Sequence, residues 1–200
     1  MKSLSYKSLR MIAMGGLALA AGVAEAHTGH GTSDVLEGLA HPFGMDHLLA
    51  MVAVGIWSVC ALPATKAWWG PTTFMLSLIV SAALGAIGVT VPFLEHMISL
   101  SVALFGVMLI FSRQQMTASF GLGTIALAAS LHGLAHGAEA PASGFIAYAA
   151  GFLATTAALH FGGVLAGLSI RRHLASQGGW AITALGSACG AAGLYLFSQV

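Results

Sequence analysis

Two short segments carry imidazole and carboxylate side chains in a chain that otherwise has very few charges. Residues 41–47 read HPFGMDH, and residues 132–139 read HGLAHGAE. Neutral imidazole is a good ligand for nickel, copper and zinc, and a carboxylate adds the negative charge that offsets a divalent cation. The residue types therefore point to the binding of a transition metal.

The second segment places its polar groups on one side of a helix. At about 100° per residue, the side chains of His132, His136 and Glu139 fall within roughly 60° of one another. Two imidazoles and a carboxylate then project from a single stripe, which favours a shared metal site. The alternative is a pair of histidines that hydrogen-bond between helices, with Glu139 at the water interface.

The first segment has a less regular geometry. On a straight helix, His41 would point about 120° away from His47, and Asp46 about 100° away from its neighbour His47. Pro42 removes a backbone donor and Gly44 loosens the turn, so a bend here would swing His41 back. The alternatives are a water-exposed His41 and an Asp46–His47 pair that bond only to each other.

Two other side chains offer atoms that bind metals. Met51 lies one turn beyond His47 and offers a thioether, although simple core packing is the better explanation of this residue. His160 lies in an apolar run, away from both segments. It is either a ligand on an exit path or, as the somewhat simpler alternative, a core histidine whose nitrogens are hydrogen-bonded. Nothing in the sequence assigns a role to His27, His30, Glu95 or His96.

Composition places these segments in a membrane protein. Of 200 residues, 58% are hydrophobic and 6% are charged, against about 25% charged residues in a soluble domain. The net charge of +1 gives no reason to expect nucleic acid as a partner. Cys60 and Cys189 both lie in apolar runs and are interpreted as buried hydrophobic residues.

The first 26 residues have the pattern of a secretory signal peptide. Lys2, Lys7 and Arg10 precede an apolar run that is too short to span comfortably, and 24–26 reads AEA, a small-x-small cleavage site. Cleavage would leave residues 27–200 as the mature permease domain, with His27 first and outside the cytoplasm. The alternative is an uncleaved first helix.

The mature chain predicts an all-α membrane protein with six transmembrane helices. Apolar stretches of about 20 residues recur near 36–62, 72–93, 96–112, 118–138, 143–170 and 180–198. The runner-up has five spans, with the last two miscounted.

An external N-terminus puts all basic residues of the mature chain in cytoplasmic loops, as the positive-inside rule requires. These residues are Lys66, Arg113, Arg171 and Arg172. This indicates a multi-pass protein of a bacterial inner membrane.

With this topology, both polar segments lie at the outer end of the membrane. The first span runs inward and the fourth runs outward, so residues 41–47 and 132–139 meet on the same side. Polar motifs in spans one and four also suggest a three-plus-three inverted repeat.

The two segments resemble the HupE/UreJ family of nickel/cobalt permeases. The match covers His41-Pro42, Asp46-His47 with the following residues 48–57 (LLAMVAVGIW), and residues 132–139. The resemblance implies secondary uptake of nickel or cobalt, often linked to hydrogenase or urease assembly. By motif match it implies metal-handling roles for His41, Asp46, His47, His132, His136 and Glu139.

One departure from the family pattern concerns His41. Family members place five residues between the first histidine and the aspartate, whereas four stand here. Five would align the first and second histidines on a helix, so His41 can reach the site only if the chain is bent around residues 42–44.

We therefore predict a permease for nickel or cobalt, with the ion as transported substrate and no permanent cofactor. Nothing resembles a nucleotide-binding loop, and no enzymatic activity is expected. Two rivals stay open. A membrane zinc hydrolase would use three histidines and an acid to hold zinc with one open position. A metal sensor or accessory protein would bind the ion without moving it.

Overall fold

The computed structural model describes residues 35–114, 116–141, 143–173 and 178–200, all within one unit, Gly31–Val200. These residues form helices and no strand, which confirms the all-α prediction. The predicted signal peptide, the predicted new terminus at His27 and the nearby His30 lie outside the described residues.

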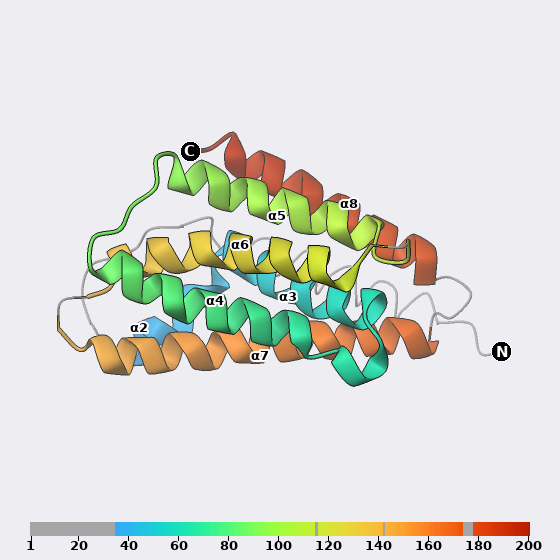
Figure 1. Ribbon diagram of the computed structural model, residues 1–200, viewed down its shortest axis with the longest axis horizontal. Helices are drawn as coiled ribbons and strands as arrows, with labels where there is room; N and C mark the ends of the chain where they lie inside the picture. Colours follow the sequence, from blue (N-terminus) through green and yellow to red (C-terminus); the bar gives the residue numbers. More distant parts are fainter. Residues whose placement is uncertain (1–34, 115, 142, 174–177) are drawn as a thin grey trace. The chain divides into compact units, whose positions relative to one another are not determined.

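The helices follow one another with short connections (Figure 1). In chain order they are α2 (Val35–Ala40), the 3-10 turn η1 (His41–Phe43), α3 (Met45–Ala61), the 3-10 turn η2 (Ala64–Lys66), α4 (Trp69–Ala86), α5 (Leu94–Ile110), α6 (Ala118–Ala138), α7 (Phe145–His173) and α8 (Gly178–Phe197).

Four of the described helical segments are long and apolar enough to cross a membrane. They are Ala64–Ala86, Ala118–Ala138, Phe145–Arg172 and Gly178–Phe197. A fifth span arises if Val35–Phe43 and Met45–Ala61, which meet at a 73° bend, are counted together. Helix α5 is apolar but shorter, with 17 residues. The chain is therefore a multi-pass membrane protein, while the predicted number of six spans is not confirmed.

The second predicted span, 72–93, differs most from the structure. Helix α4 begins at Trp69 and ends at Ala86, well before the apolar run ends. The reason is local: Gly88 adopts a positive φ of 90°, which glycine adopts at little cost and which stops the helix. Hydropathy alone does not register this turn because the following residues remain apolar.

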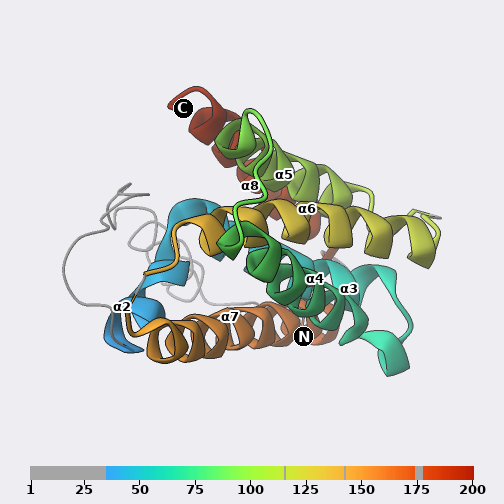
Figure 2. The same ribbon diagram turned by 60° about the vertical axis from the view of Figure 1, so that its left-hand side comes forward.

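The helices pack as pairs of non-consecutive elements. The most extensive contacts join α4 with α6, α5 with α8, and α7 with both α3 and α2. Figures 1 and 2 show α5 and α8 together on one side of the unit, and α7 along α2 and α3 on the other.

Close approach of these pairs depends on glycine. A Cβ added at Gly133 or Gly137 of α6 would overlap the backbone of α4, and one added at Gly55 of α3 would overlap the His160 carbonyl of α7. Small residues at helix crossings are typical of membrane helix packing. They bring the polar side chains of facing helices within reach of one another.

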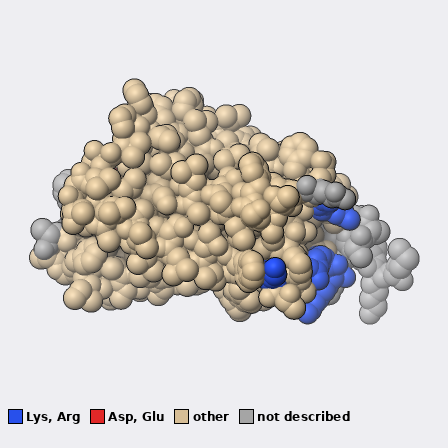
Figure 3. Space-filling model, in the orientation of Figure 1, with Lys and Arg blue, Asp and Glu red and all other residues tan. Residues whose placement is uncertain are grey.

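Charge separates the two ends of the described bundle. The basic side chains lie where α3, α5 and α7 end, at Lys66, Arg113, Arg171 and Arg172, whereas Glu37, Asp46, Glu95 and Glu139 lie near the opposite helix ends. The face drawn in Figure 3 is almost entirely uncharged, with basic side chains gathered at one end. The described helices expose large apolar residues such as Leu127 and Val80, which suits contact with lipid.

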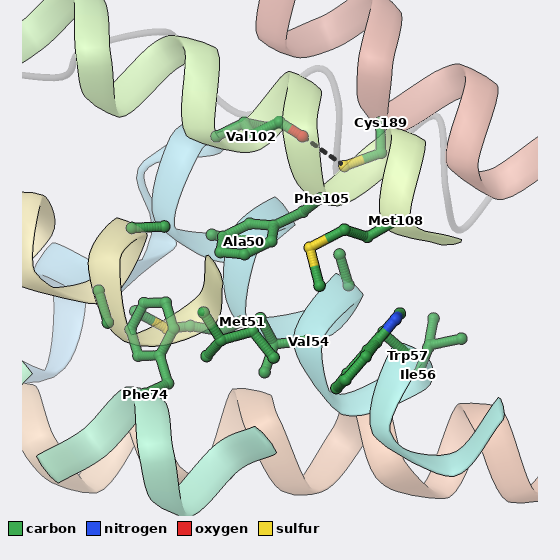
Figure 4. Close-up of a cluster of buried hydrophobic side chains, with 14 of the residues drawn as sticks. Ala50, Met51, Val54, Ile56, Trp57, Phe74, Val102, Phe105, Met108 and Cys189 are labelled. Carbon is green, nitrogen blue, oxygen red and sulfur yellow. Dashed lines mark hydrogen bonds between the residues drawn. The ribbon is translucent and has the colours of Figure 1, made fainter. Parts of the chain in front are cut away.

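Between the two ends lies a tightly packed apolar core. Trp57, Phe74, Phe105 and Met51 are buried there with smaller side chains from α3 to α6 (Figure 4). On the α5–α8 side, the Cys189 thiol contacts the Val102 carbonyl oxygen at 3.5 Å. Cys60 and Cys189 are both free; Cys189 is buried, as predicted, whereas Cys60 is half-buried.

Candidate metal centre

The helix break predicted at residues 42–44 is confirmed. Pro42 occupies the first turn of η1, and Gly44, with an extended ψ of 140°, separates η1 from α3. The Gly44 N–H bonds the His41 carbonyl at 3.2 Å, and Leu48 N–H bonds the Gly44 carbonyl at 2.9 Å to begin α3. The chain thus turns by 73° between two helical pieces, and His41 and His47 face a common volume.

Helix α7 holds the bent segment in place. A Cβ on Gly38 would overlap the α7 backbone at Tyr148, and one on Gly151 would overlap α2 at Val35. The Thr155 hydroxyl donates to the Leu39 carbonyl at 2.9 Å, which satisfies an acceptor at the end of α2. The position of His41 therefore depends on a neighbouring helix as well as on its own.

The inner part of the cluster consists of Asp46, His47 and His132, whose ligand atoms lie within 4.8 Å of one another. His47 Nδ1 lies 2.9 Å from Asp46 Oδ1, and His47 Nε2 lies 3.3 Å from His132 Nδ1. Both histidines are buried. Asp46 sits in the first turn of α3, where the helix dipole favours a negative charge.

Hydrogen bonds assign the tautomers of His47 and His132. Ser101 Oγ donates to the Ile98 carbonyl at 2.7 Å, so it accepts from His132 Nε2 at 3.0 Å. His132 Nδ1 then carries the lone pair. In the same way, the Asp46 carboxylate accepts a hydrogen bond from His47 Nδ1–H, which leaves the lone pair on His47 Nε2.

The two lone pairs face each other across the cluster. Two imidazole nitrogens that both lack a proton cannot hydrogen-bond to each other. His136 Nε2 also contacts His47 Nε2, and His136 Nδ1 is buried with no hydrogen-bond partner in the described structure. Three imidazoles that converge in this way fit a divalent cation, which would accept the lone pairs of His47 Nε2 and His132 Nδ1.

The outer part of the cluster consists of His41, His136 and Glu139, again within 4.8 Å. The ring centroids of His41 and His136 are 4.8 Å apart, and Glu139 follows the last residue of α6 and is exposed. His41 is half-buried. The contact between His47 and His136 joins this outer group to the inner one, so all six predicted residues meet in one cluster.

Three neighbours of the cluster were absent from the sequence prediction. The Tyr148 and Phe152 rings of α7 flank His41 at centroid distances of 5.8 and 5.9 Å, and Phe152 lies 4.5 Å from His136. Ser101 of α5 orients His132. A single serine, tyrosine or phenylalanine in an apolar helix has the same sequence pattern as a packing residue, so only the structure reveals these three.

The other polar residues noted in the sequence lie elsewhere. His96 packs between Phe93 and Phe197 and belongs to neither ligand group among the described residues. Met51 is fully buried in the core below the cluster. His160 is buried in the middle of α7 and contacts Phe74.

Comparison with known proteins gives a consistent result. Residues 15–196 match the family described as HupE / UreJ protein. The chain is 38% identical over 144 residues to "Protein HupE" of Rhizobium leguminosarum bv. viciae, an alignment that covers 71% of this chain and 74% of the relative. No solved structure matches.

Proposed function

Because the chain belongs to the HupE/UreJ family, we propose that it is a secondary transporter that carries a divalent transition metal ion across the inner membrane, with nickel as the favoured cargo and cobalt as the alternative. The family assignment supports a role in metal transport or in an accessory step of metal handling. The proposal includes a functional link to hydrogenase or urease assembly, which the family resemblance implies.

The observation that carries the proposal is the set of unprotonated imidazole nitrogens that converge beside two carboxylates. His47 Nε2 and His132 Nδ1 present lone pairs to each other at 3.3 Å, with Asp46 behind His47. Imidazole ligands suit nickel and cobalt, while Asp46 and Glu139 lower the cost of bringing a divalent charge into an apolar bundle. The ion is the substrate of this site.

Orientation follows from the separation of charge. With the basic end of the bundle in the cytoplasm, as the positive-inside rule requires, the cluster opens to the outside. A membrane potential that is negative inside then favours uptake by about 2.3 kcal/mol per elementary charge per 100 mV. The signal-peptide pattern predicts that the mature chain begins at His27, outside the cytoplasm, which mass spectrometry of the purified protein tests. An intact Met1 would contradict the cleavage and remove one support for this orientation.

The helix pairs support the predicted three-plus-three repeat. In such a repeat, α3 corresponds to α6, α4 to α7 and α5 to α8. Under this correspondence the pair α3–α7 becomes α6–α4, and the pair α5–α8 maps onto itself. All three pairs are among the most extensive contacts. The contact α5–α6 becomes α8–α3, which also exists, whereas α3–α4 and α3–α5 have no comparable counterpart. Related halves are a common basis of alternating access in carriers.

The test is uptake of radioactive nickel into cells that express the chain, with cobalt, zinc and copper as competitors. The proposal predicts saturable uptake above cells without the protein, with stronger competition from cobalt than from zinc. Tight metal binding without uptake would instead indicate an accessory protein. Metal retained through purification, together with hydrolytic activity, would indicate the membrane metalloenzyme.

A further inference from the structure

A buried histidine that is separate from the cluster lies deeper in the bundle. His160 of α7 has 1% of its surface exposed, so it faces the interior of the described bundle and not lipid. Phe152, which contacts His136, lies eight residues earlier on the same helix, or about 12 Å along the axis. His160 is therefore displaced from the cluster toward the basic end.

One nitrogen of His160 is satisfied and the other is not. His160 Nδ1 donates to the Thr156 carbonyl at 2.8 Å, so the lone pair resides on Nε2. Nε2 is buried and has no hydrogen-bond partner among the described residues. A buried polar atom without a partner is costly, particularly within a membrane, and such an atom is a candidate for function.

The Phe74 ring connects this histidine to the cluster. Its centroid lies 5.8 Å from the ring of His132 and 4.8 Å from the ring of His160, and Phe74 itself is fully buried. An ion that leaves His132 toward the basic end of the bundle would meet the Phe74 ring first and His160 next. Figure 4 shows Phe74 on the α4 side of the apolar core, with Met51 among the same buried side chains.

Charge distinguishes this position from the cluster. The described acidic residues lie at the opposite end of the bundle, and Arg171 follows His160 on α7 by eleven residues, or about 16 Å. A cation at His160 would therefore have a neutral imidazole as ligand and no nearby carboxylate to offset its charge. Such a site favours rapid release over tight binding.

We propose that His160 Nε2 is a transient ligand for the transported divalent cation, reached from the His47–His132 group when the Phe74 side chain moves aside. This inference rests on the proposed transport function. It adds a second binding position to the cluster and gives the ion a route through the apolar core.

The first test separates a ligand from a structural histidine. His160→Asn retains an N–H at the place of Nδ1, which can still bond the Thr156 carbonyl, but removes the lone pair of Nε2. We expect the maximal rate of nickel uptake to fall about tenfold or more, while equilibrium nickel binding to the purified protein stays within about twofold of wild type, because the cluster is intact. His96→Asn is the matched control, since His96 lies outside both ligand groups, and its uptake should be normal.

The second test does not depend on transport. His160→Cys in a chain that also carries Cys60→Ser and Cys189→Ser places the sole thiol at this position. Addition of Cd²⁺ to the purified protein should produce the ultraviolet charge-transfer band of a cadmium thiolate, which the histidines and carboxylates of the cluster cannot produce. The same chain with the native His160 should show no band.

These readouts distinguish the two proposals. Normal uptake by His160→Asn, or no cadmium thiolate band in a correctly folded His160→Cys chain, overturns the role of His160 and leaves the transport proposal intact. A wild-type chain that binds nickel but never transports it overturns the transport proposal. A band observed in that case still places a cation at position 160.

Discussion

The two arms that supply the cluster achieve the same task by different means. Helix α6 presents His132, His136 and Glu139 through regular helical spacing, so its backbone alone aligns them. The α2–η1–α3 arm brings His41 to His47 through a 73° break that α7 holds in place. Replacement of the α6 ligands themselves should therefore have the main effect on nickel uptake through that arm. The contribution of His41 to uptake should also change when residues that never touch the ion are replaced.

The α6 arm gives the largest expected effect. His132→Ala or His136→Ala should reduce nickel uptake by about 100-fold or more, since each removes an imidazole from the centre of the cluster. The amount of protein in the membrane, measured by immunoblot, should be unchanged. Near-normal uptake by either variant would mean that these histidines serve helix packing and not metal binding.

On the broken arm, Asp46 tests the importance of charge. Asp46→Asn keeps the shape of the side chain and removes the charge that offsets a divalent cation, so it should be nearly as damaging as Asp46→Ala in the same uptake assay. If the asparagine variant transports at the wild-type rate, Asp46 acts only as a hydrogen-bond partner that orients His47.

His41 should show an intermediate effect. It belongs to the outer group and contacts His136, so His41→Ala should weaken nickel uptake by about tenfold, mostly as an increase in KM, because the inner group remains complete. Uptake kinetics over a range of nickel concentrations measure this. Unchanged kinetics would reduce the working ligand set to the other five residues.

The contact between α2 and α7 offers the smallest and most specific effect. Gly151→Ala places a Cβ where the α2 backbone lies, whereas Gly162→Ala on the same helix meets open space. Gly151→Ala should lower uptake severalfold by displacing His41, and Gly162→Ala should leave it unchanged. Equal behaviour of the two variants would show that the bend does not depend on α7.

The two arms also differ in how far the sequence predicted them. Helical periodicity was sufficient for His132, His136 and Glu139, because α6 is regular through residue 138. For His41 periodicity was misleading, and the break followed only from Pro42 and Gly44 together with the family resemblance. The direction of the bend depends on glycine contacts between α2 and α7, which are distant in sequence and leave no local pattern.

Other parts of the site could not be predicted for similar reasons. Ser101, Tyr148 and Phe152 come from α5 and α7, and their closeness to the cluster is a result of tertiary packing. The lack of a hydrogen-bond partner for His160 Nε2 could not be predicted either, because a buried histidine with both nitrogens hydrogen-bonded gives the same sequence pattern. The early end of α4 follows from the conformation of Gly88, which hydropathy does not report.

The central claim is that the six-residue cluster passes a divalent metal ion across the membrane. The most direct test is nickel accumulation in proteoliposomes that contain only the purified chain, under an imposed potential that is negative inside. The account predicts potential-dependent, saturable accumulation by the wild-type protein and none above background by His132→Ala. Equal accumulation by both proteins, or none by a wild-type chain that binds nickel, would contradict it.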